Sequence, residues 1–289
     1  MAQFNFKAIG TTWVIDIFED ITKEKEAQVL YLVMARIDDF DKAYSRFRSD
    51  SLVSEISEKA GTYIFGEDSK ELFALYHELY NRTGGFFTPL IGQLLVDAGY
   101  DAEYSLKQKK ELSVPPTWES VMDFSFPTLT TKRPIKLDFG AAGKGYIIDL
   151  IGQVLEKEGI KKYYIDAGGD IRQRGSESMR IGLEHPQNET QAIGVYSLQN
   201  RSICGSAGNR RKWKNFNHII NPKTLSSPKN IIAVWAVADT TFLADALTTC
   251  LFFVPAGDLT KFYKFEYLLI HDDLSVEKSA NFAGEIFTV

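Results

Sequence analysis

Residues 138–155 read DFGAAGKGYIIDLIGQVL, a glycine-rich turn that runs directly into an amphipathic segment. The pattern predicts a short strand over residues 135–137 before the turn, and a helix from about residue 144 to residue 158 after it. One face of this helix is apolar and carries Ile147, Leu150, Ile151, Val154 and Leu155. Gly159 follows where a helix C-cap is expected.

The glycines at this junction allow two interpretations. They free backbone N–H groups at the start of the helix, where the helix dipole favours an anion such as a phosphate. They also suit an ordinary tight turn beside a solvated Lys144. The spacing is neither that of a Walker loop, because Gly145 follows the lysine, nor that of the G-x-G-x-x-G dinucleotide fingerprint.

Helices and strands alternate irregularly on both sides of this stretch. Long runs with apolar residues on one face predict helices over residues 23–44, 69–82 and 241–254. Runs rich in β-branched and aromatic residues predict strands over residues 12–18, 163–165, 179–184, 192–198, 231–237 and 267–270. The segment with Pro115, Pro116 and Trp118 is expected to be irregular but packed. Such an order, without regular βα repeats, is typical of an α+β fold with mixed sheets and packed helices.

The composition is that of a globular protein. Of the 289 residues, 44% are hydrophobic and 25% are charged, which argues against long disorder. The net charge of -5 argues against nucleic acid as a partner, and two cysteines are too few for a disulfide scaffold. No apolar run is long enough for a transmembrane segment, and no secretory signal is visible at the start. The sequence as it stands therefore predicts a cytoplasmic protein, or an extracytoplasmic one if a signal or lipid anchor has been removed.

Three further sites could carry chemistry, but each also allows a purely structural interpretation. Two glycines separate the carboxylates of Asp166 and Asp170, which suits either the approach of a ligand or a turn that Asp170 caps. Asp245 and Thr249 lie four residues apart on an apolar helix. They could be Mg²⁺ ligands, or they could form a polar pair at the helix start. His218, at a strand end, could be a base in a cleft or a structural histidine.

The order of the motifs resembles that of the ApbE-type FAD:protein FMN transferase family over nearly the whole chain. The matching segments, in the order of the family, are Ile9-Gly-Thr-Thr12, Tyr44-Ser-Arg-Phe47 with Asp50-Ser51, Thr83-Gly-Gly-Phe-Phe87 with Pro89, Asp138-Phe-Gly-Ala-Ala-Gly-Lys-Gly-Tyr146, Asp166-Ala-Gly-Gly-Asp170, His218-Ile-Ile-Asn-Pro222 and Ala244-Asp-Ala-Leu-Thr-Thr249. Seven matches in order are far more specific than any one glycine turn.

The resemblance implies a fold and an activity. The fold would be a single flavin transferase domain over residues 1–289, which could divide into two interleaved subdomains, around an FAD cleft. The activity would be Mg²⁺-dependent transfer of FMN from FAD to a threonine or serine hydroxyl of an acceptor protein, with release of AMP. FAD and that acceptor protein would be the partners, and Mg²⁺ the cofactor.

The resemblance also implies roles for individual residues. Asp245, Thr249 and the main-chain carbonyl of Gly143 would be metal ligands. His218 would be the catalytic base near the reacting hydroxyl. The FAD-binding residues would be Gly10, Thr11, Phe47, Ser51, Gly85, Phe86, Lys144, Asp166, Gly168, Gly169, Asp170 and His218.

The chain departs from the family pattern at four positions. Thr88 and Asn221 stand where the family has aspartate, Ala207 where a serine is common, and Leu225 where a glycine is usual. Two alternatives to the transferase stay open. One is a Mg²⁺-dependent FAD pyrophosphatase that yields FMN and AMP when water replaces the acceptor hydroxyl. The other is a non-catalytic FAD-binding protein, which the loss of two carboxylates favours.

Overall fold

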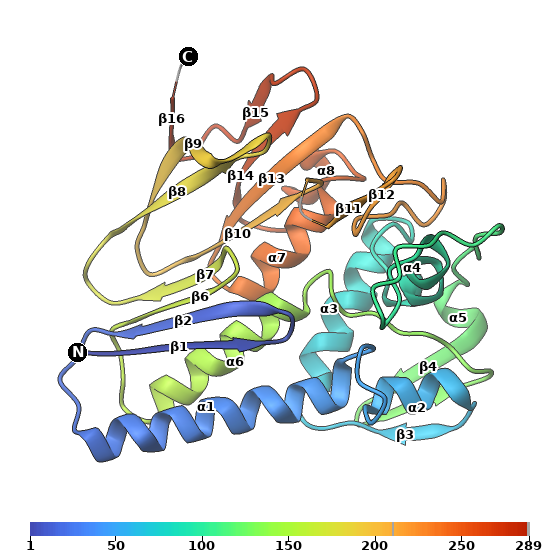
Figure 1. The fold of residues 1–289 in the computed structure, drawn as a ribbon, viewed down its shortest axis with the longest axis horizontal. Coiled ribbons are helices and arrows are strands. Elements are labelled where there is room, and N and C mark those ends of the chain that lie inside the picture. The colour runs from blue at the N-terminus through green and yellow to red at the C-terminus, as the bar shows by residue number, and fades with distance from the viewer. Residues whose placement is uncertain (210, 288–289) are drawn as a thin grey trace. The chain divides into compact units, whose positions relative to one another are not determined.

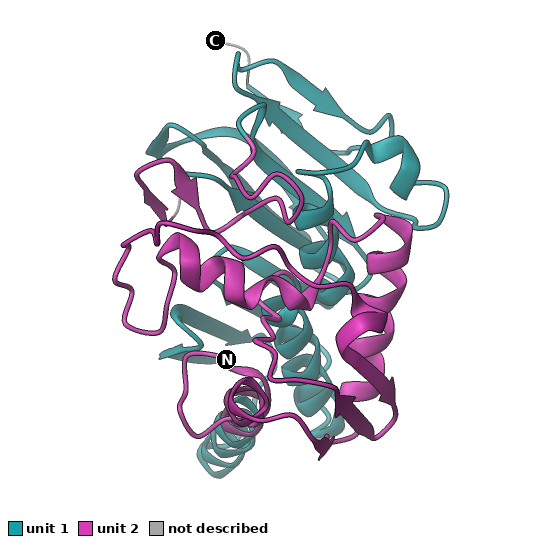
Figure 2. Ribbon diagram, turned by 90° about the vertical axis from the view of Figure 1, so that its right-hand side faces the viewer, with its two compact units in different colours: residues 1–37, 142–210, 229–289 teal, residues 38–141, 211–228 magenta. Residues whose placement is uncertain are grey.

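The computed structural model describes residues 1–209 and 211–287 (Figure 1). The chain forms two compact units that are interleaved along the sequence (Figure 2). Unit 1 comprises residues 1–37, 142–210 and 229–289, and unit 2 comprises residues 38–141 and 211–228. The first boundary falls inside helix α1 (Lys23–Tyr44).

Unit 1 is built on an eight-stranded sheet in which every neighbouring pair is antiparallel. Its strands, in spatial order, are β1 (Ala2–Ala8), β2 (Thr11–Ile17), β6 (Tyr163–Ala167), β7 (Asp170–Arg174), β10 (Ser202–Ala207), β13 (Ile231–Ala238), β14 (Glu266–His271) and β15 (Val276–Lys278). The tight connection between β6 and β7 contains Gly168 and Gly169, both with positive φ. Glycine adopts this left-handed conformation without strain, so the two strands can reverse within two residues.

The two faces of this sheet carry different layers. Helices α6 (Gly143–Lys157) and α7 (Thr241–Cys250) pack together and against the sheet (Figure 1). The Cys204 thiol on β10 lies 3.6 Å from the Thr241 carbonyl of α7. Side chains alternate along a strand, so the neighbouring Ile203 points to the opposite face. There it packs against a three-stranded sheet of β8 (Met179–His185), β9 (Asn188–Leu198) and β16 (Glu285–Ile286). Helix α8 (Ala256–Leu259) follows α7 in the chain.

Unit 2 contains short helices and two small sheets. Its helices are α2 (Leu52–Glu58), α3 (Ser69–Arg82), the 3₁₀ turn η1 (Pro89–Ile91), α4 (Gly92–Ala98) and α5 (Trp118–Val121). Its sheets are β3 (Thr62–Ile64), β5 (Thr128–Thr131) and β4 (Met122–Ser125), and the hairpin of β11 (Lys212–Trp213) and β12 (Phe216–Asn217). The hairpin joins the core of the unit through Trp213, whose Nε1 donates to the Ala98 carbonyl at 2.8 Å.

The α+β class and most of the expected elements are confirmed. The helices over residues 23–44 and 69–82 have the predicted bounds. Gly159, at φ 84°, follows the last turn of α6, and the Ile160 N–H donates to the Leu155 carbonyl as in a helix C-cap.

Two predicted elements are wrong. Residues 135–137 form no strand. The Ile135 N–H donates to the Ile56 carbonyl and the Asp138 N–H to the Pro89 carbonyl, so no one strand pairs with this segment. The helix predicted over 241–254 ends at Cys250, where the chain continues in turns before Pro255. The expected irregular segment also ends earlier than predicted, since Trp118 begins α5.

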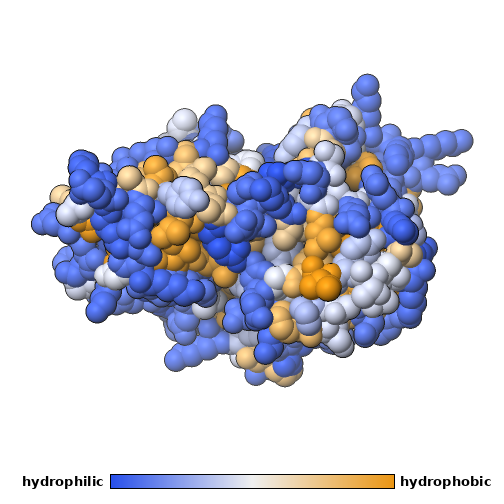
Figure 3. All heavy atoms as spheres, turned by 90° about the horizontal axis from the view of Figure 1, so that it is seen from below, coloured by the Kyte–Doolittle hydropathy of each residue, from blue (hydrophilic) through white to orange (hydrophobic). Residues whose placement is uncertain are grey.

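The surface has the usual mixture of residues. On the face drawn in Figure 3, hydrophilic residues cover most of the area, and apolar residues form smaller groups between them. No helix in the described ranges combines the length and apolar composition needed to span a bilayer.

The core of the large sheet predicts a contrast between two valines in the same sheet. Val237 on β13 is fully buried, whereas Val276 on the edge strand β15 is 47% exposed. Removing buried methyl groups loses transfer free energy and leaves a cavity, so Val237→Ala should lower the free energy of unfolding by about 2–3 kcal/mol. Val276→Ala should change it by less than about 1 kcal/mol. Urea unfolding followed by circular dichroism measures both, and equal losses would contradict this assignment of the core.

Candidate functional site

The predicted site residues divide between the two units. Unit 1 holds Gly10, Thr11, Gly143, Lys144, Asp166, Gly168, Gly169, Asp170, Asp245 and Thr249. Unit 2 holds Phe47, Ser51, Gly85, Phe86 and His218.

In unit 1 the backbone of α6 touches α7 at Gly145. A Cβ atom there would lie 2.3 Å from the Thr241 carbonyl oxygen and 2.6 Å from the Cβ of Asp245, so only glycine fits. The Gly145 N–H donates to Oδ2 of Asp245 at 2.8 Å, and the Asp245 side chain is buried. Thr249, half-buried, lies one turn further along the same face of α7. Asp245 of the predicted metal pair thus lies at a close contact of the two helices.

Lys144 connects the start of α6 to the turn between β6 and β7. Its ammonium forms an ion pair with Asp170, which is 1% exposed, while the Lys144 side chain itself remains 26% exposed. The structure therefore brings together two residues that the sequence placed in separate motifs.

The two glycine turns of unit 1 also meet. A Cβ atom on Gly168 would lie 2.2 Å from Oγ1 of Thr11, so the threonine hydroxyl lies directly against the glycine backbone. In the same turn, the Gly169 N–H donates to Oδ1 of Asp166 at 2.8 Å. Gly10, which precedes Thr11, has a φ of 70°. This packing makes the β1–β2 and β6–β7 turns one structural element.

Burial and like charges shift the pKa values of these groups. Burial, helped by the nearby Asp170 carboxylate, raises the pKa of Asp245 to about 8, although Lys144 acts against the rise. Burial alone would lower the pKa of Lys144, but the carboxylates of Asp170 and Asp245 outweigh it and raise that pKa. Burial also raises the pKa of Asp166. The cluster therefore holds more negative charge than its one lysine compensates.

This donor set fits a hard divalent cation. A buried carboxylate with a raised pKa gains from a cation that replaces its proton, and Thr249 adds a hydroxyl oxygen one turn away. Within residues 1–209 and 211–287, no three His, Cys, Asp or Glu side chains are grouped as metal ligands. A Mg²⁺ ion at Asp245 would therefore complete its coordination with oxygens of a bound phosphate and of water.

In unit 2, Phe47 belongs to an aromatic cluster. Its ring stacks on Tyr104 at 5.4 Å between centroids and meets Tyr100 edge-on at 5.5 Å. The Arg46 guanidinium lies 4.1 Å from the centroid of the Phe47 ring and forms an ion pair with Asp138. Aromatic and cationic groups of this kind suit a planar ligand, as predicted for Phe47.

The other predicted FAD residues of unit 2 have clear local roles. Ser51 is the N-cap of α2: its Oγ accepts from the Ser54 N–H at 3.1 Å and donates to the Ser45 carbonyl at 2.6 Å. Gly85 has a φ of 86°, and the Lys223 ammonium lies 4.1 Å from the centroid of the Phe86 ring.

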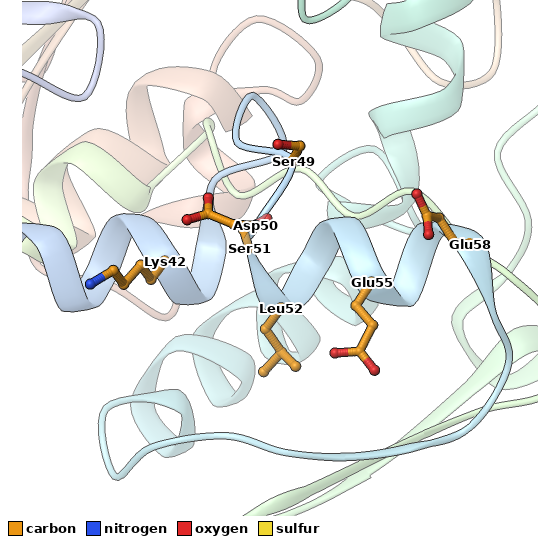
Figure 4. Close-up of a pocket in the computed structure, with 7 residues that line it drawn as sticks. All are labelled: Lys42, Ser49, Asp50, Ser51, Leu52, Glu55 and Glu58. Carbon is orange, nitrogen blue, oxygen red and sulfur yellow. The ribbon is translucent and has the colours of Figure 1, made fainter.

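A hollow beside Ser51 has the wrong charge for a phosphate. Its lining residues are Lys42, Ser49, Asp50, Ser51, Leu52, Glu55 and Glu58 (Figure 4). Three carboxylates against one lysine would repel the pyrophosphate of FAD. The hollow therefore gives no support for a phosphate role of Ser51.

His218 follows β12 directly and is half-buried, in agreement with the predicted strand end. Asn221, three residues later, turns the chain: its Oδ1 accepts from the N–H groups of Lys223 and Thr224 at 2.9 and 3.1 Å. Leu225 closes that turn with a φ of 56°, a conformation that favours glycine. Asn221 and Leu225 thus form a turn directly after the His218 motif.

Two charged residues beside the α6–α7 contact of unit 1 were missed by sequence reasoning. Asp149 on α6 and Arg172 on β7 form a buried ion pair with 2.6 Å between Nη1 and Oδ1. The available signal was an aspartate in the middle of the apolar run IIDLI. A charge at such a position is rarely buried without a partner.

Comparison with known proteins gives consistent results. The sequence pattern of the ApbE family matches residues 9–268. The "FAD:protein FMN transferase" of Buchnera aphidicola subsp. Schizaphis graminum is 25% identical over 93% of this chain and 83% of its own length. That of Escherichia coli K12 is 22% identical over 84% of this chain and 75% of its own.

Solved structures show the same fold. The ApbE protein of Thermotoga maritima superposes with a TM-score of 0.84 at 21% identity, over 97% of both chains. The flavin transferase ApbE of Vibrio cholerae superposes with a TM-score of 0.79 at 18% identity, over 96% of both chains. The expected α+β fold is thereby confirmed.

The raised pKa of Asp245 makes the stability of the metal-free protein depend on pH. The folded state holds this proton more tightly than the unfolded chain, so the stabilisation is complete below the ordinary pKa of 3.8 and is lost as pH rises through about 8. The Tm of the metal-free protein should therefore fall, relative to that of Asp245→Asn, between about pH 4 and about pH 8. Added Mg²⁺ should reverse the fall, because the cation replaces the proton.

Thermal unfolding of both proteins in matched buffers measures this difference. Lys144, Asp170 and Asp149, whose charges act on Asp245, are present in both proteins, so the two proteins differ only in the group at position 245. A Tm difference that stays constant across the pH range would contradict the raised pKa.

Proposed function

Because the chain belongs to the ApbE family, we propose that it transfers FMN from FAD to a threonine or serine hydroxyl of an acceptor protein and releases AMP. Relatives named FAD:protein FMN transferase in several species support this activity. The observation in the structure that supports it best is the buried Asp245, held by Gly145 at the α6–α7 contact beside the Lys144–Asp170 pair.

We propose that Asp245 and Thr249 bind Mg²⁺, with the main-chain carbonyl of Gly143 as a further ligand. When bound, the ion would neutralise the pyrophosphate of FAD and stabilise the negative charge that develops on the departing AMP. Lys144 and the glycine turns of unit 1 would bind phosphate oxygens through the ammonium and through backbone N–H groups. Thr11 and Asp166 shape these turns, since each contacts the Gly168–Gly169 backbone.

For the flavin itself, we propose contacts from unit 2. Phe47 and Phe86 offer aromatic surfaces, and each already lies beside a cationic group, Arg46 and Lys223 respectively. A flavin ring can stack on such surfaces while its carbonyl oxygens accept hydrogen bonds. Ser51 and Gly85 would act by shaping the neighbouring backbone.

In the transfer step, the oxygen of the acceptor hydroxyl attacks the phosphorus of the FMN moiety. The new P–O bond forms as the bond to the AMP phosphate breaks, and the hydroxyl proton passes to an imidazole nitrogen of His218. Water in place of the hydroxyl would give free FMN, so exclusion of water decides between transfer and hydrolysis. Asn221 cannot stabilise an imidazolium as a carboxylate would, so His218 should be a weaker base here than in relatives with aspartate.

Incubation with FAD, Mg²⁺ and a candidate acceptor tests this function. We expect AMP in solution and an acceptor whose mass has increased by one FMN group. Asp245→Asn keeps the shape but removes the charge that faces the cation, so transfer should fall by orders of magnitude while the fold survives. Asp258→Asn, an exposed aspartate on α8, is the matched control and should leave the rate unchanged.

Each of the other outcomes would indicate a different function for this protein. Free FMN with AMP would indicate an FAD pyrophosphatase, and unchanged FAD a non-catalytic flavin-binding protein. Transfer that continues after removal of divalent metal by a chelator would refute the metal assignment.

A second variant tests the proposed base. His218→Ala should retain FAD binding, followed by flavin fluorescence, while the rate of AMP release falls by ~10²–10⁴. Loss of FAD binding together with activity would make His218 a ligand contact or a structural residue. If both binding and rate survive, the base lies elsewhere.

A further inference from the structure

The first turn of α7 is capped by a side chain from another helix. The first N–H groups of an α-helix have no partner within the helix. In α7, the N–H groups of Thr241 and Phe242 donate to Oδ1 and Oδ2 of Asp149 at 3.0 and 2.8 Å. The next N–H, that of Leu243, donates to Oγ1 of the N-cap Thr240 at 3.2 Å. Asp149 thus supplies, from α6, two of the three bonds that begin the helix.

Arg172 holds this carboxylate in place. Its Nη1 donates to Oδ1 of Asp149 at 2.6 Å, and both side chains are about 9% exposed. The guanidinium is itself fixed, because Nε donates to the hydroxyl of Tyr163 at 3.0 Å and Nη2 to Glu156 at 3.2 Å. A Cβ atom on Gly152 would lie 2.6 Å from that Nε, so the arginine packs directly on the backbone of α6. The buried charge is therefore paired and cannot easily move.

Two contacts from one face of α6 hold α7. Gly145 and Asp149 lie four residues apart on α6, and their partners Asp245 and Thr241 lie four residues apart on α7. Residues four apart share a helix face, so the two helices meet in antiparallel register over one turn. A displacement of the α7 start would move Asp245 away from the Gly145 N–H.

We propose that Asp149, held by Arg172, is a positioning residue for the metal site. It keeps the start of α7 on α6, so that the Asp245 carboxylate stays on the Gly145 N–H and the Thr249 hydroxyl, one turn further, faces the same ion. The proposal rests on the proposed function for the metal itself, but the link between Asp149 and Asp245 can be measured without metal.

The test uses the full-length protein and two measurements. One is the Mg²⁺ concentration that half-saturates the rise in Tm in the presence of FAD. The other is the hydrogen-exchange rate of the Gly145 amide in the metal-free protein, followed by NMR. Asp149→Asn replaces one acceptor oxygen by a donor, so the Mg²⁺ midpoint should rise ~10–100-fold, as is usual when a residue that supports a metal ligand is lost. The Gly145 amide should exchange faster, because its bond to Asp245 is loosened.

The matched control is Asp97→Asn in unit 2. Asp97 is equally buried and accepts from Gln93, Lys109 and the Ser113 N–H at 2.7–3.0 Å, and all three partners belong, like Asp97 itself, to unit 2. This variant should lose stability without changing either readout. If Asp149→Asn fails to fold, Asp149→Glu keeps the charge, lengthens the side chain and should shift both readouts in the same directions.

The outcomes separate this proposal from the proposed function. If the Asp149 variants match Asp97→Asn in both readouts, the positioning role is refuted. Asp245→Asn must raise the Mg²⁺ midpoint more than Asp149→Asn does. If Asp245→Asn leaves the Mg²⁺ midpoint unchanged, the metal assignment has failed. The exchange rate of the Gly145 amide in the Asp149 variants then still decides whether Asp149 positions Asp245.

Discussion

The close contact of α6 and α7 at Gly145 is the constraint on which the candidate metal site depends. A side chain at this position would overlap the Thr241 carbonyl, so the two helix backbones approach as closely as the chain allows. The approach places a main-chain N–H on the Asp245 carboxylate and buries it. A carboxylate in such a place is costly unless hydrogen bonds or a cation compensate it. The packing of two helices is thus also what prepares the site for a metal ion.

Charge is distributed around this contact in an ordered way. Asp149 is compensated fully, by Arg172 and by two N–H groups of α7. Asp170 is paired with Lys144. The buried Asp245 carboxylate accepts from the Gly145 N–H and shares the charge of Lys144 with Asp170. Its raised pKa reflects this incomplete compensation of a buried charge. Of these three carboxylates, Asp245 has the least compensation, and it is the one that we propose to bind the cation, whereas its two neighbours form structural pairs.

The departures from the family pattern change less than the sequence suggested. Thr88 accepts from the Leu90 N–H at 3.2 Å and so caps η1, a task that an aspartate side chain also performs. Asn221 makes the turn after His218 through its side-chain oxygen, and Leu225 keeps a left-handed φ without being glycine. Thr88 and Asn221 thus fill these backbone roles with neutral side chains. Relative to aspartate they remove negative charge, and their effect should therefore appear in proton transfer more than in folding.

The sequence by itself determined the helices over 23–44 and 69–82, four of the eight strands of the large sheet, the α+β class and the family, because these depend on periodicity and on residues close in the chain. It did not determine that 135–137 is no strand, since a strand needs a partner and the neighbouring N–H groups pair elsewhere. The links from Lys144 to Asp170, Gly145 to Asp245 and Asp149 to α7 also came only from the tertiary structure. These partners lie 26 to 100 residues apart, and no local pattern encodes which buried charge will meet which backbone amide.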